Sequence, residues 1–181
     1  MIIPAILMKD EIERAFRKKA YTEDIFFYNG WIGNLPNEVK EDEDLWSFAI
    51  VDADETKPFG EEYILIGYIS FRIDHYSAQA YNFGLIRFED KAFFTKEGRR
   101  IIPESIMAAG ILEVIRKLED MNLHRIEFRC VEGNPAEAGY TKIINRLSNQ
   151  YRISIMRLED VCRNSAGGWH DSIIFQLIRR G

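Results

Sequence analysis

The sequence contains little of what metal and redox proteins depend on. Its 181 residues include two cysteines, Cys130 and Cys162, which form no CxxC pair, and three histidines that lie far apart. A metal site needs several such ligands at defined spacings, so we expect no bound metal. Cys130 falls in an apolar, strand-like segment, where we expect a small core residue.

An excess of positive charge and long apolar runs are also missing. The chain carries 24 Lys and Arg against 29 Asp and Glu, a net charge of -5. Because binding to nucleic-acid phosphates requires a basic face, we expect no nucleic-acid partner. No apolar run approaches the roughly 20 residues that span a bilayer, and no secretory signal pattern is visible. We therefore expect no membrane partner and a cytoplasmic location.

What remains is an ordinary globular composition, with 46% hydrophobic and 29% charged residues. The length favours a single domain over residues 1–181, large enough to bury a core. No internal repeat and no low-complexity linker divides it. The aromatic-rich segment 22–33, TEDIFFYNGWIG, reads as a short helical or irregular piece that lines a ligand site or belongs to the core.

Hydrophobic periodicity predicts alternating helical and extended segments. Apolar residues at helical spacing predict amphipathic helices, and alternating or continuous apolar runs predict strands. The expected helices are 8–20, 103–121 and a segment from Asn134 to about Leu147, and the expected strands are 45–53, 63–73, 80–89, 124–131, 152–161 and 169–179. The first three strands have short links and predict an antiparallel meander. The whole is an α+β fold, a mixed sheet with helices packed on it.

The basic segment TKEGRRI, residues 95–101, lies between a strand and the most regular helix. A helix N-terminus exposes unpaired N–H groups and the positive end of the helix dipole, where anions bind readily. Gly98 allows close approach of the backbone, while Lys96, Arg99 and Arg100 add positive charge. The segment is therefore either a pyrophosphate-binding loop or a solvated basic loop before a helix.

The segment VEGNPAEAGYTK, residues 131–142, combines a helix start with a tyrosine. Asn134 is a good N-cap, Pro135 a good first helical residue, and Glu137 completes a capping box. Tyr140 lies on the second turn, where a phenol could donate a proton to a thiolate leaving group. The alternative is a tyrosine that packs its ring against the core.

Three further polar features are weaker candidates. In WHDS, His170 and Asp171 are neighbours on an expected strand and point to opposite faces, so they form no simple catalytic pair. His75 follows Asp74 in an expected turn. Glu89, at the end of an expected strand, could relay a proton from an amine.

Taken together, these segments resemble the GNAT superfamily of acyl-CoA-dependent N-acyltransferases, in its RimJ/RimL-like branch. The resemblance runs from about Trp46 to the end of the chain. It is carried by four stretches in the family's order: LIGYISFRID with AYNFGLIRF, KEGRRIIPESIMAAGILEVI, RIEFRCVEGNPAEAGYTK and GGWHDSIIFQLI.

The resemblance implies a single domain with splayed central strands and acetyl-CoA as co-substrate. It implies that the amine of a small molecule, peptide or protein attacks the thioester directly, with Tyr140 as the acid that protonates the thiolate. The resemblance leaves room for a homodimer. The residues that it implies for the acetyl-CoA site are Ile86 and Phe88 on the strand, Lys96, Glu97, Gly98, Arg99, Arg100 and Ile101 in the loop, and Asn134 beside the pantetheine.

The chain departs from the family pattern at two places. In the loop only Gly98 matches the family's Q/R-x-x-G-x-G/A pattern, because Thr95 and Arg100 hold its first and last positions. Tyr140 lies six residues after Asn134, one residue earlier than is usual in the family. The altered loop keeps a second reading open, that of a catalytically inactive GNAT-fold module which binds CoA or regulates a partner.

Overall fold

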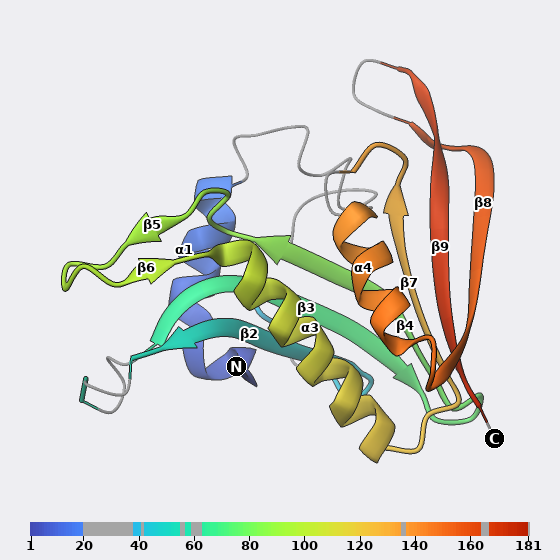
Figure 1. Cartoon of the computed structure of the whole chain (residues 1–181), viewed down its shortest axis with the longest axis horizontal. Helices are drawn as coiled ribbons and strands as arrows, with labels where there is room; N and C mark the ends of the chain where they lie inside the picture. The colour runs from blue at the N-terminus through green and yellow to red at the C-terminus, as the bar shows by residue number, and fades with distance from the viewer. Residues whose placement is uncertain are drawn as a thin grey trace.

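The computed structural model describes residues 1–19, 38–40, 42–54, 57–58, 63–134, 137–163 and 167–180. Within this part of the chain, seven strands form one mixed sheet in the order β1-β2-β3-β4-β7-β9-β8, and two short strands pair separately (Figure 1). The strands of the sheet are β1 (Ile2–Pro4), β2 (Leu45–Ala53), β3 (Tyr63–Asp74), β4 (Gln79–Arg87), β7 (Arg125–Val131), β9 (Trp169–Arg179) and β8 (Tyr151–Arg163). All neighbouring pairs are antiparallel except β4 and β7, which run parallel.

Helices lie on both faces of this sheet. The 3-10 helix η1 (Ala5–Met8) and α1 (Lys9–Lys19) cover one face, while α3 (Pro103–Asp120) and α4 (Glu137–Leu147) cover the other (Figure 1). Pro103 occupies the start of α3, where its missing N–H costs nothing, and a turn at Met121 and Asn122 ends the helix. The sheet therefore has a separate core on each face.

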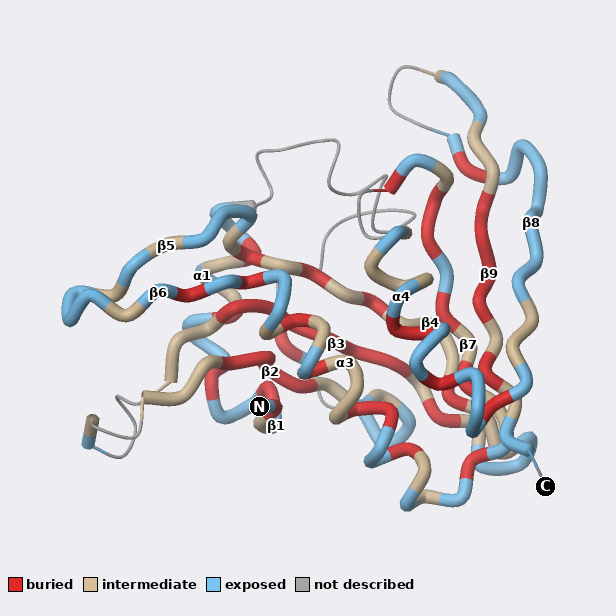
Figure 2. Tube along the Cα trace, in the orientation of Figure 1, coloured by how far each residue is buried: buried red, intermediate tan, exposed pale blue. Residues whose placement is uncertain are grey.

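Each core lies between the sheet and the buried side of the helices that cover that face (Figure 2). The larger core packs α3 and α4 on the sheet and includes Val114, Ile115 and Phe128, each at most 7% exposed. The smaller core packs α1 on the other face through Ile12 and Phe16. β3 contributes to both, since Ile66 and Ile69 belong to the first and Tyr68 to the second, which explains its continuous apolar sequence.

The structure confirms the predicted α+β class and the meander β2-β3-β4. The predicted strand 45–53 has the bounds of β2, and the predicted helix 103–121 ends one residue before its predicted end. Two predictions were incomplete: residues 2–4 form the edge strand β1, and the basic loop contains a hairpin of β5 (Phe93–Phe94) and β6 (Arg100–Ile101). The predicted piece at 22–33 lies outside the described residues.

Candidate functional site

An opening between the parallel strands β4 and β7 is the main candidate site. The two strands pair only at their first residues, Gln79 with Arg125 and Ala80 with Ile126. Beyond these pairs β4 continues along β3 to Arg87, and β7 continues along β9. In Figure 1 the two strands diverge, and α4 lies over the space between them. The sheet is thus closed where β4 and β7 begin and open where the two strands end.

A β-bulge in β4 accounts for this divergence. Arg72 pairs with Tyr81 and Ser70 with Gly84, so the two residues Asn82 and Phe83 lie opposite the single intervening residue of β3. The backbone of Asn82 has a positive φ of 55°. A bulge of this kind bends its strand and increases the local twist. Because it follows directly on the last pair with β7, it turns β4 away from that strand.

The pairing of β4 with β3 decides which backbone groups reach the opening. The Phe88 N–H donates to the Ile66 carbonyl of β3 at 2.9 Å. In an antiparallel pair such groups alternate between the two sides of a strand, so Ile86 also directs its N–H and C=O toward β3. The groups that point into the opening are those of Leu85 and Arg87. The backbone groups of Ile86 and Phe88, at which the sequence predicted cofactor contacts, therefore face β3 and not the opening.

An apolar pocket lies at the inner end of the opening, beneath α3 and α4. Its cavity volume is about 20 Å³. The lining comes from β3, β4, β7, α3 and α4 and consists of Ile69, Phe83, Leu85, Ile111, Val114, Ile115, Ile126, Phe128 and Tyr140. Apart from the phenol of Tyr140, these side chains carry no polar group. The pocket is therefore suited to an apolar group and is unfavourable for water.

Tyr140 projects from α4 into this pocket. Its ring packs edge-on against Phe128 and Phe175, with centroid distances of 5.2 and 6.0 Å. Burial raises the pKa of Tyr140 above its ordinary value of 10, and the nearby Cys130 thiol raises it further. The phenol thus stays protonated at neutral pH and has a proton to donate. The structure places the tyrosine predicted as an acid beside the opening, although its ring also packs as the alternative reading required.

Cys130 lies on the same face of β7 as Phe128, two residues before it, and is 1% exposed. Burial, with a smaller contribution from the Glu137 carboxylate, raises the pKa of Cys130 to about 12. A thiol with that pKa is neutral at physiological pH and is a poor nucleophile. Cys130 is therefore the core residue that its apolar sequence context predicts.

Asn134 occupies the turn that joins β7 to α4. It is 6% exposed, its N–H donates to the Val131 carbonyl at 3.0 Å, and its carbonyl accepts the Glu137 N–H at 2.9 Å. Gly133 precedes it with a φ of 79°, a conformation that favours glycine. The turn thus holds Asn134 at the start of α4, on the helix that carries Tyr140.

An ion-pair cluster ties the same turn to the last two strands. Arg157 of β8 contacts Glu132 at 2.7 Å and Asp171 at 3.3 Å. The Glu132 N–H also donates to the Asp171 carbonyl at 2.9 Å. Asp171 therefore forms an ion pair with Arg157, which supports the structural reading of WHDS.

The segment predicted to bind pyrophosphate is the tip of the β5–β6 hairpin. Thr95 organises it: its N–H donates to the Arg99 carbonyl at 2.8 Å, its carbonyl accepts the Gly98 N–H at 3.0 Å, and its hydroxyl accepts the Arg99 N–H at 3.2 Å. Gly98 has a φ of 85°, which the turn requires. Two of the amide groups expected to bind phosphate are thus engaged within the hairpin.

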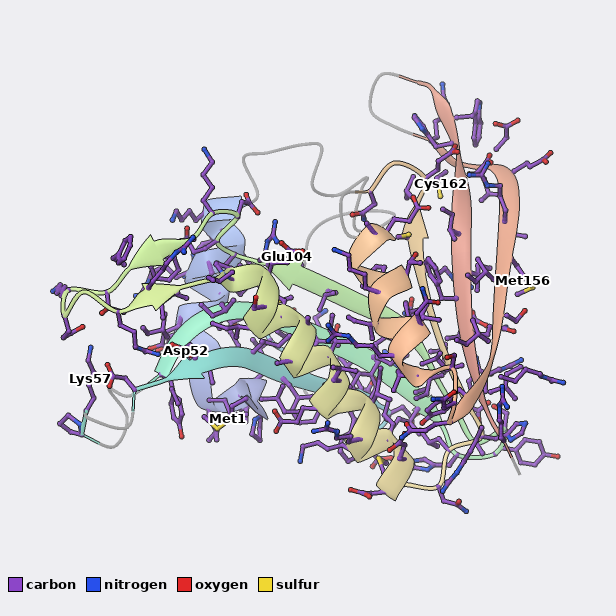
Figure 3. The ribbon with its side chains drawn as sticks, in the orientation of Figure 1. Met1, Asp52, Lys57, Glu104, Met156 and Cys162 are labelled. Atoms are coloured by element: carbon purple, nitrogen blue, oxygen red, sulfur yellow. The ribbon has the colours of Figure 1, made fainter. Side chains whose placement is uncertain are left out.

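Ion pairs with the end of β2 and with the residues after it hold this hairpin in place. Arg99 pairs with Asp52 and lies 3.9 Å from Asp54, and Glu97 pairs with Lys57 at 3.4 Å. Figure 3 shows Asp52 and Lys57 beside the hairpin. A hydrogen bond from its own amide and one from Thr95 lower the pKa of Glu97. The positive charge of Arg99 is therefore balanced within the protein, which the sequence did not predict.

The residues that lead into α3, and its first turn, carry charges of both signs. Arg100 and Lys96 are exposed, and Ile101 is buried at 2%. Glu104 lies in the first turn of α3 (Figure 3). A carboxylate there satisfies the positive end of the helix dipole and competes with a bound anion. Of the predicted loop residues, Lys96 and Arg100 thus retain the exposed positive charge.

The remaining candidates have structural partners. Asp74 accepts hydrogen bonds from the Tyr76 and Ser77 amides at 2.9 and 3.2 Å, so the segment at His75 is a turn. Glu89 pairs with Lys18 of α1 at 3.3 Å. The described residues contain no group of three or more His, Cys, Asp or Glu placed to hold a metal. None of the helices in the described ranges is long and apolar enough to cross a bilayer.

Several solved structures with a similar architecture are acetyltransferases. An Arabidopsis thaliana NAA60 in complex with a bisubstrate analogue matches at a TM-score of 0.56 over 99% of both chains, with 17% identity. The microcin C7 self-immunity acetyltransferase MccE, in complex with acetyl-CoA and AMP, matches at 0.57 over 93% of this chain and 86% of that one, with 15% identity.

A probable GNAT-family acetyltransferase from Chromobacterium violaceum ATCC 12472 matches at 0.54 over 91% of this chain and 79% of that one, with 12% identity. Against another probable acetyltransferase, at a TM-score of 0.50 and 18% identity, the match covers 76% of this chain but only 63% of the other. The sequence itself matches no protein-family model and no curated relative. The RimJ/RimL-like branch stays a prediction. What the likeness establishes is the GNAT fold, with its seven-stranded sheet and flanking helices.

Proposed function

We propose that this protein is an N-acetyltransferase that transfers the acetyl group of acetyl-CoA to a primary amine of a small molecule, peptide or protein. The observation that carries the proposal is the opening between β4 and β7, which has β4 backbone groups along one side and Tyr140 over its inner end. A pantetheine arm is an extended chain of amides, and it can pair with a free strand edge as another strand would.

The residues around the opening supply the parts that direct acyl transfer needs. The N–H of Leu85 points into the opening and would donate to the thioester carbonyl oxygen, which becomes an oxyanion in the transition state. A neutral amine attacks the carbonyl carbon, and the carbon–sulfur bond breaks. Tyr140, protonated at neutral pH, would donate its proton to the departing sulfur, while the amine loses a proton to solvent and the phenolate regains one from solvent.

Further contacts would hold the rest of the co-substrate. Arg87 would pair through its backbone with the arm near the open end, and Asn134 would contact it from the β7–α4 turn. Lys96 and Arg100 would attract the pyrophosphate at the start of α3. Arg99 would act indirectly, because its pairs with Asp52 and Asp54 fix the hairpin that carries these two cations.

Calorimetric titration with acetyl-CoA, followed by a panel of amines with detection of free thiol, tests this function. Micromolar binding together with acetylated product supports the proposal. Binding without product from any amine favours the alternative, a catalytically inactive CoA-binding or regulatory module. A folded sample that binds neither acetyl-CoA nor CoA would refute both.

We also propose a homodimer that forms through β8. This strand is at the end of the sheet, with β9 as its neighbour, and it exposes Ile155, Met156, Leu158 and Val161 by 39 to 55%. A long edge strand with apolar side chains favours pairing with a second chain. Sedimentation should detect a dimer that Met156→Lys dissociates without weakening acetyl-CoA binding. A wild-type monomer at high concentration would exclude this dimer.

A further inference from the structure

The β5–β6 hairpin has one buried face and one exposed face. Phe93 pairs with Ile101 across the hairpin, and both side chains pack on the larger core, where Ile101 is 2% exposed. Because successive side chains of a strand point to opposite faces, the next pair, Phe94 with Arg100, points away from this core. Phe94 is accordingly 69% exposed, and Arg100 is exposed as well. The outer face of the hairpin therefore presents an aromatic ring beside a guanidinium group.

The backbone under this outer face is firmly held. Hydrogen bonds of Thr95 close the turn between the two strands, and the ion pairs of Arg99 and Glu97 anchor the turn to the residues at and after the end of β2. The ring of Phe94 is thus carried by a fixed segment and stays in water. Such a ring loses little conformational entropy when a flat group stacks on it, so it is a prepared surface for stacking.

The outer face lies next to the position proposed for the pyrophosphate. β6 leads through Ile102 directly into α3, which begins at Pro103 (Figure 1). Arg100 therefore precedes the helix by three residues, a distance of roughly 10 Å along an extended chain. In CoA a single ribose separates the pyrophosphate from the adenine. A pyrophosphate bound at the start of α3 thus brings the adenine within reach of Phe94.

The charges around Phe94 suit a phosphorylated nucleoside. Lys96 follows it by two residues, and Arg100 lies across the hairpin from it; both cations are exposed. The ion pairs that join this hairpin to other described residues involve Arg99 and Glu97, and neither Lys96 nor Arg100 takes part in them. The adenosine of CoA carries a phosphate on its 3′ oxygen in addition to the pyrophosphate. An aromatic ring with a cation on each side therefore complements a flat base with a phosphate on each side.

We propose that the outer face of the β5–β6 hairpin binds the nucleotide end of CoA, with the adenine stacked on Phe94 and the 3′-phosphate beside Lys96. This inference rests on the proposed function and names the part of the same site that recognises the nucleotide. Stacking of a base on one exposed ring contributes about fivefold to affinity, the low end of the range for base–aromatic stacking. An exposed ion pair with the 3′-phosphate contributes about twofold to fivefold.

Calorimetric titration of the whole chain with three donors tests the inference without an acceptor amine. The donors are acetyl-CoA, acetyl-3′-dephospho-CoA and S-acetyl-4′-phosphopantetheine, which lacks the adenosine. Phe94→Ala should raise the Kd of the first two by about fivefold and leave the Kd of the third unchanged. Phe94→Trp, which keeps an aromatic ring, should bind acetyl-CoA at least as tightly as the wild type does.

A second substitution tests the phosphate contact. Lys96→Gln should reduce the preference for acetyl-CoA over acetyl-3′-dephospho-CoA by about twofold to fivefold. The same preference in the wild type should shrink at high salt, because salt screens exposed charges.

Tyr76→Ala is the matched control for Phe94→Ala. Tyr76 is a fully exposed aromatic residue in the turn between β3 and β4, at the end of β4 where the opening is closed. Its loss should leave all three Kd values unchanged. Thermal melting checks that each variant is folded.

The outcomes separate this inference from the proposed function. Wild-type affinity for acetyl-CoA in Phe94→Ala would overturn the stacking on Phe94, and an equal loss of affinity for acetyl-CoA and S-acetyl-4′-phosphopantetheine would overturn it too, because the substitution would then act through the hairpin and not through the adenine. An unchanged preference in Lys96→Gln would overturn the 3′-phosphate contact. Each of these results leaves the proposed function standing. Failure of all three donors to bind the folded wild-type chain would refute the proposed function, and this inference with it.

Discussion

Replacing Tyr140 by phenylalanine removes the proposed acid while keeping the aromatic packing. The ring contacts with Phe128 and Phe175, at 5.2 and 6.0 Å, do not involve the hydroxyl. General acid catalysis contributes about 10²- to 10⁴-fold to a rate. We expect the low end, about 100-fold in kcat, because burial raises the pKa of this phenol far above that of a thiol near 8.5 and weakens it as an acid.

The assay is thiol release from acetyl-CoA with an amine that the wild-type protein acetylates, alongside calorimetric binding. Acetyl-CoA affinity should change by no more than about twofold, because the hydroxyl acts after binding. Because the pKa of Tyr140 is raised, its ionisation should cause no loss of wild-type kcat at any pH below about 10.

Tyr151→Phe is the matched control for this substitution. The Tyr151 hydroxyl donates to Glu119 at 2.8 Å, away from the opening. Its loss should cost about 1–2 kcal/mol of unfolding free energy and leave kcat unchanged. Wild-type kcat in Tyr140→Phe, or an equal loss of kcat in both variants, would refute Tyr140 as the acid.

Three further predictions follow from the same structure. Arg100→Gln should raise the Kd for acetyl-CoA severalfold by calorimetry, whereas Arg99→Gln should mainly lower the melting temperature; a larger Kd effect at Arg99 would contradict the assignment of their roles. Gly110→Ala should destabilise the fold by about 1–3 kcal/mol in urea unfolding, because a Cβ there would lie 2.7 Å from the Ile50 side chain; an unchanged unfolding midpoint would contradict this. Burial raises the pKa of Cys130 to about 12, above the value near 8.5–9 of an unfolded thiol. The stability that the protonated thiol contributes is therefore full below the unfolded pKa and is lost as the pH rises toward 12. Between pH 8 and 11 the unfolding free energy of Cys130→Ala should fall less steeply than that of the wild type, and an equal slope would contradict this.

The regular elements could be predicted because their apolar residues follow the periods of helix and strand. In α3, Met107, Val114 and Leu118 recur at helical spacing and are buried on one face. In β3, both faces are apolar because helices cover both sides of the sheet. The hairpin of β5 and β6 has no such pattern, since each strand has two residues and most of the hairpin is exposed.

The candidate site was predictable only at the level of its segments. Asn134 could be singled out because a helix start after a strand has recognisable capping residues, and Tyr140 because a phenol on the second turn can serve as an acid. The Leu85 and Arg87 backbone groups could not be chosen over those of Ile86 and Phe88, because the choice depends on which residues of β4 bond to β3. The sequence alone does not show the register in which β4 pairs with β3.

From the sequence one could predict the order of the longer helices and strands and the burial of Cys130, and the resemblance predicts acetyl-CoA as co-substrate. Only the tertiary structure decided that a bulge at Asn82 separates β4 from β7, and that Arg99 is paired with Asp52 from a distant strand. The physical reason is the range of each interaction. Periodicity and capping act between residues a few positions apart, whereas strand pairing and ion pairing join groups that come together only when the chain has folded.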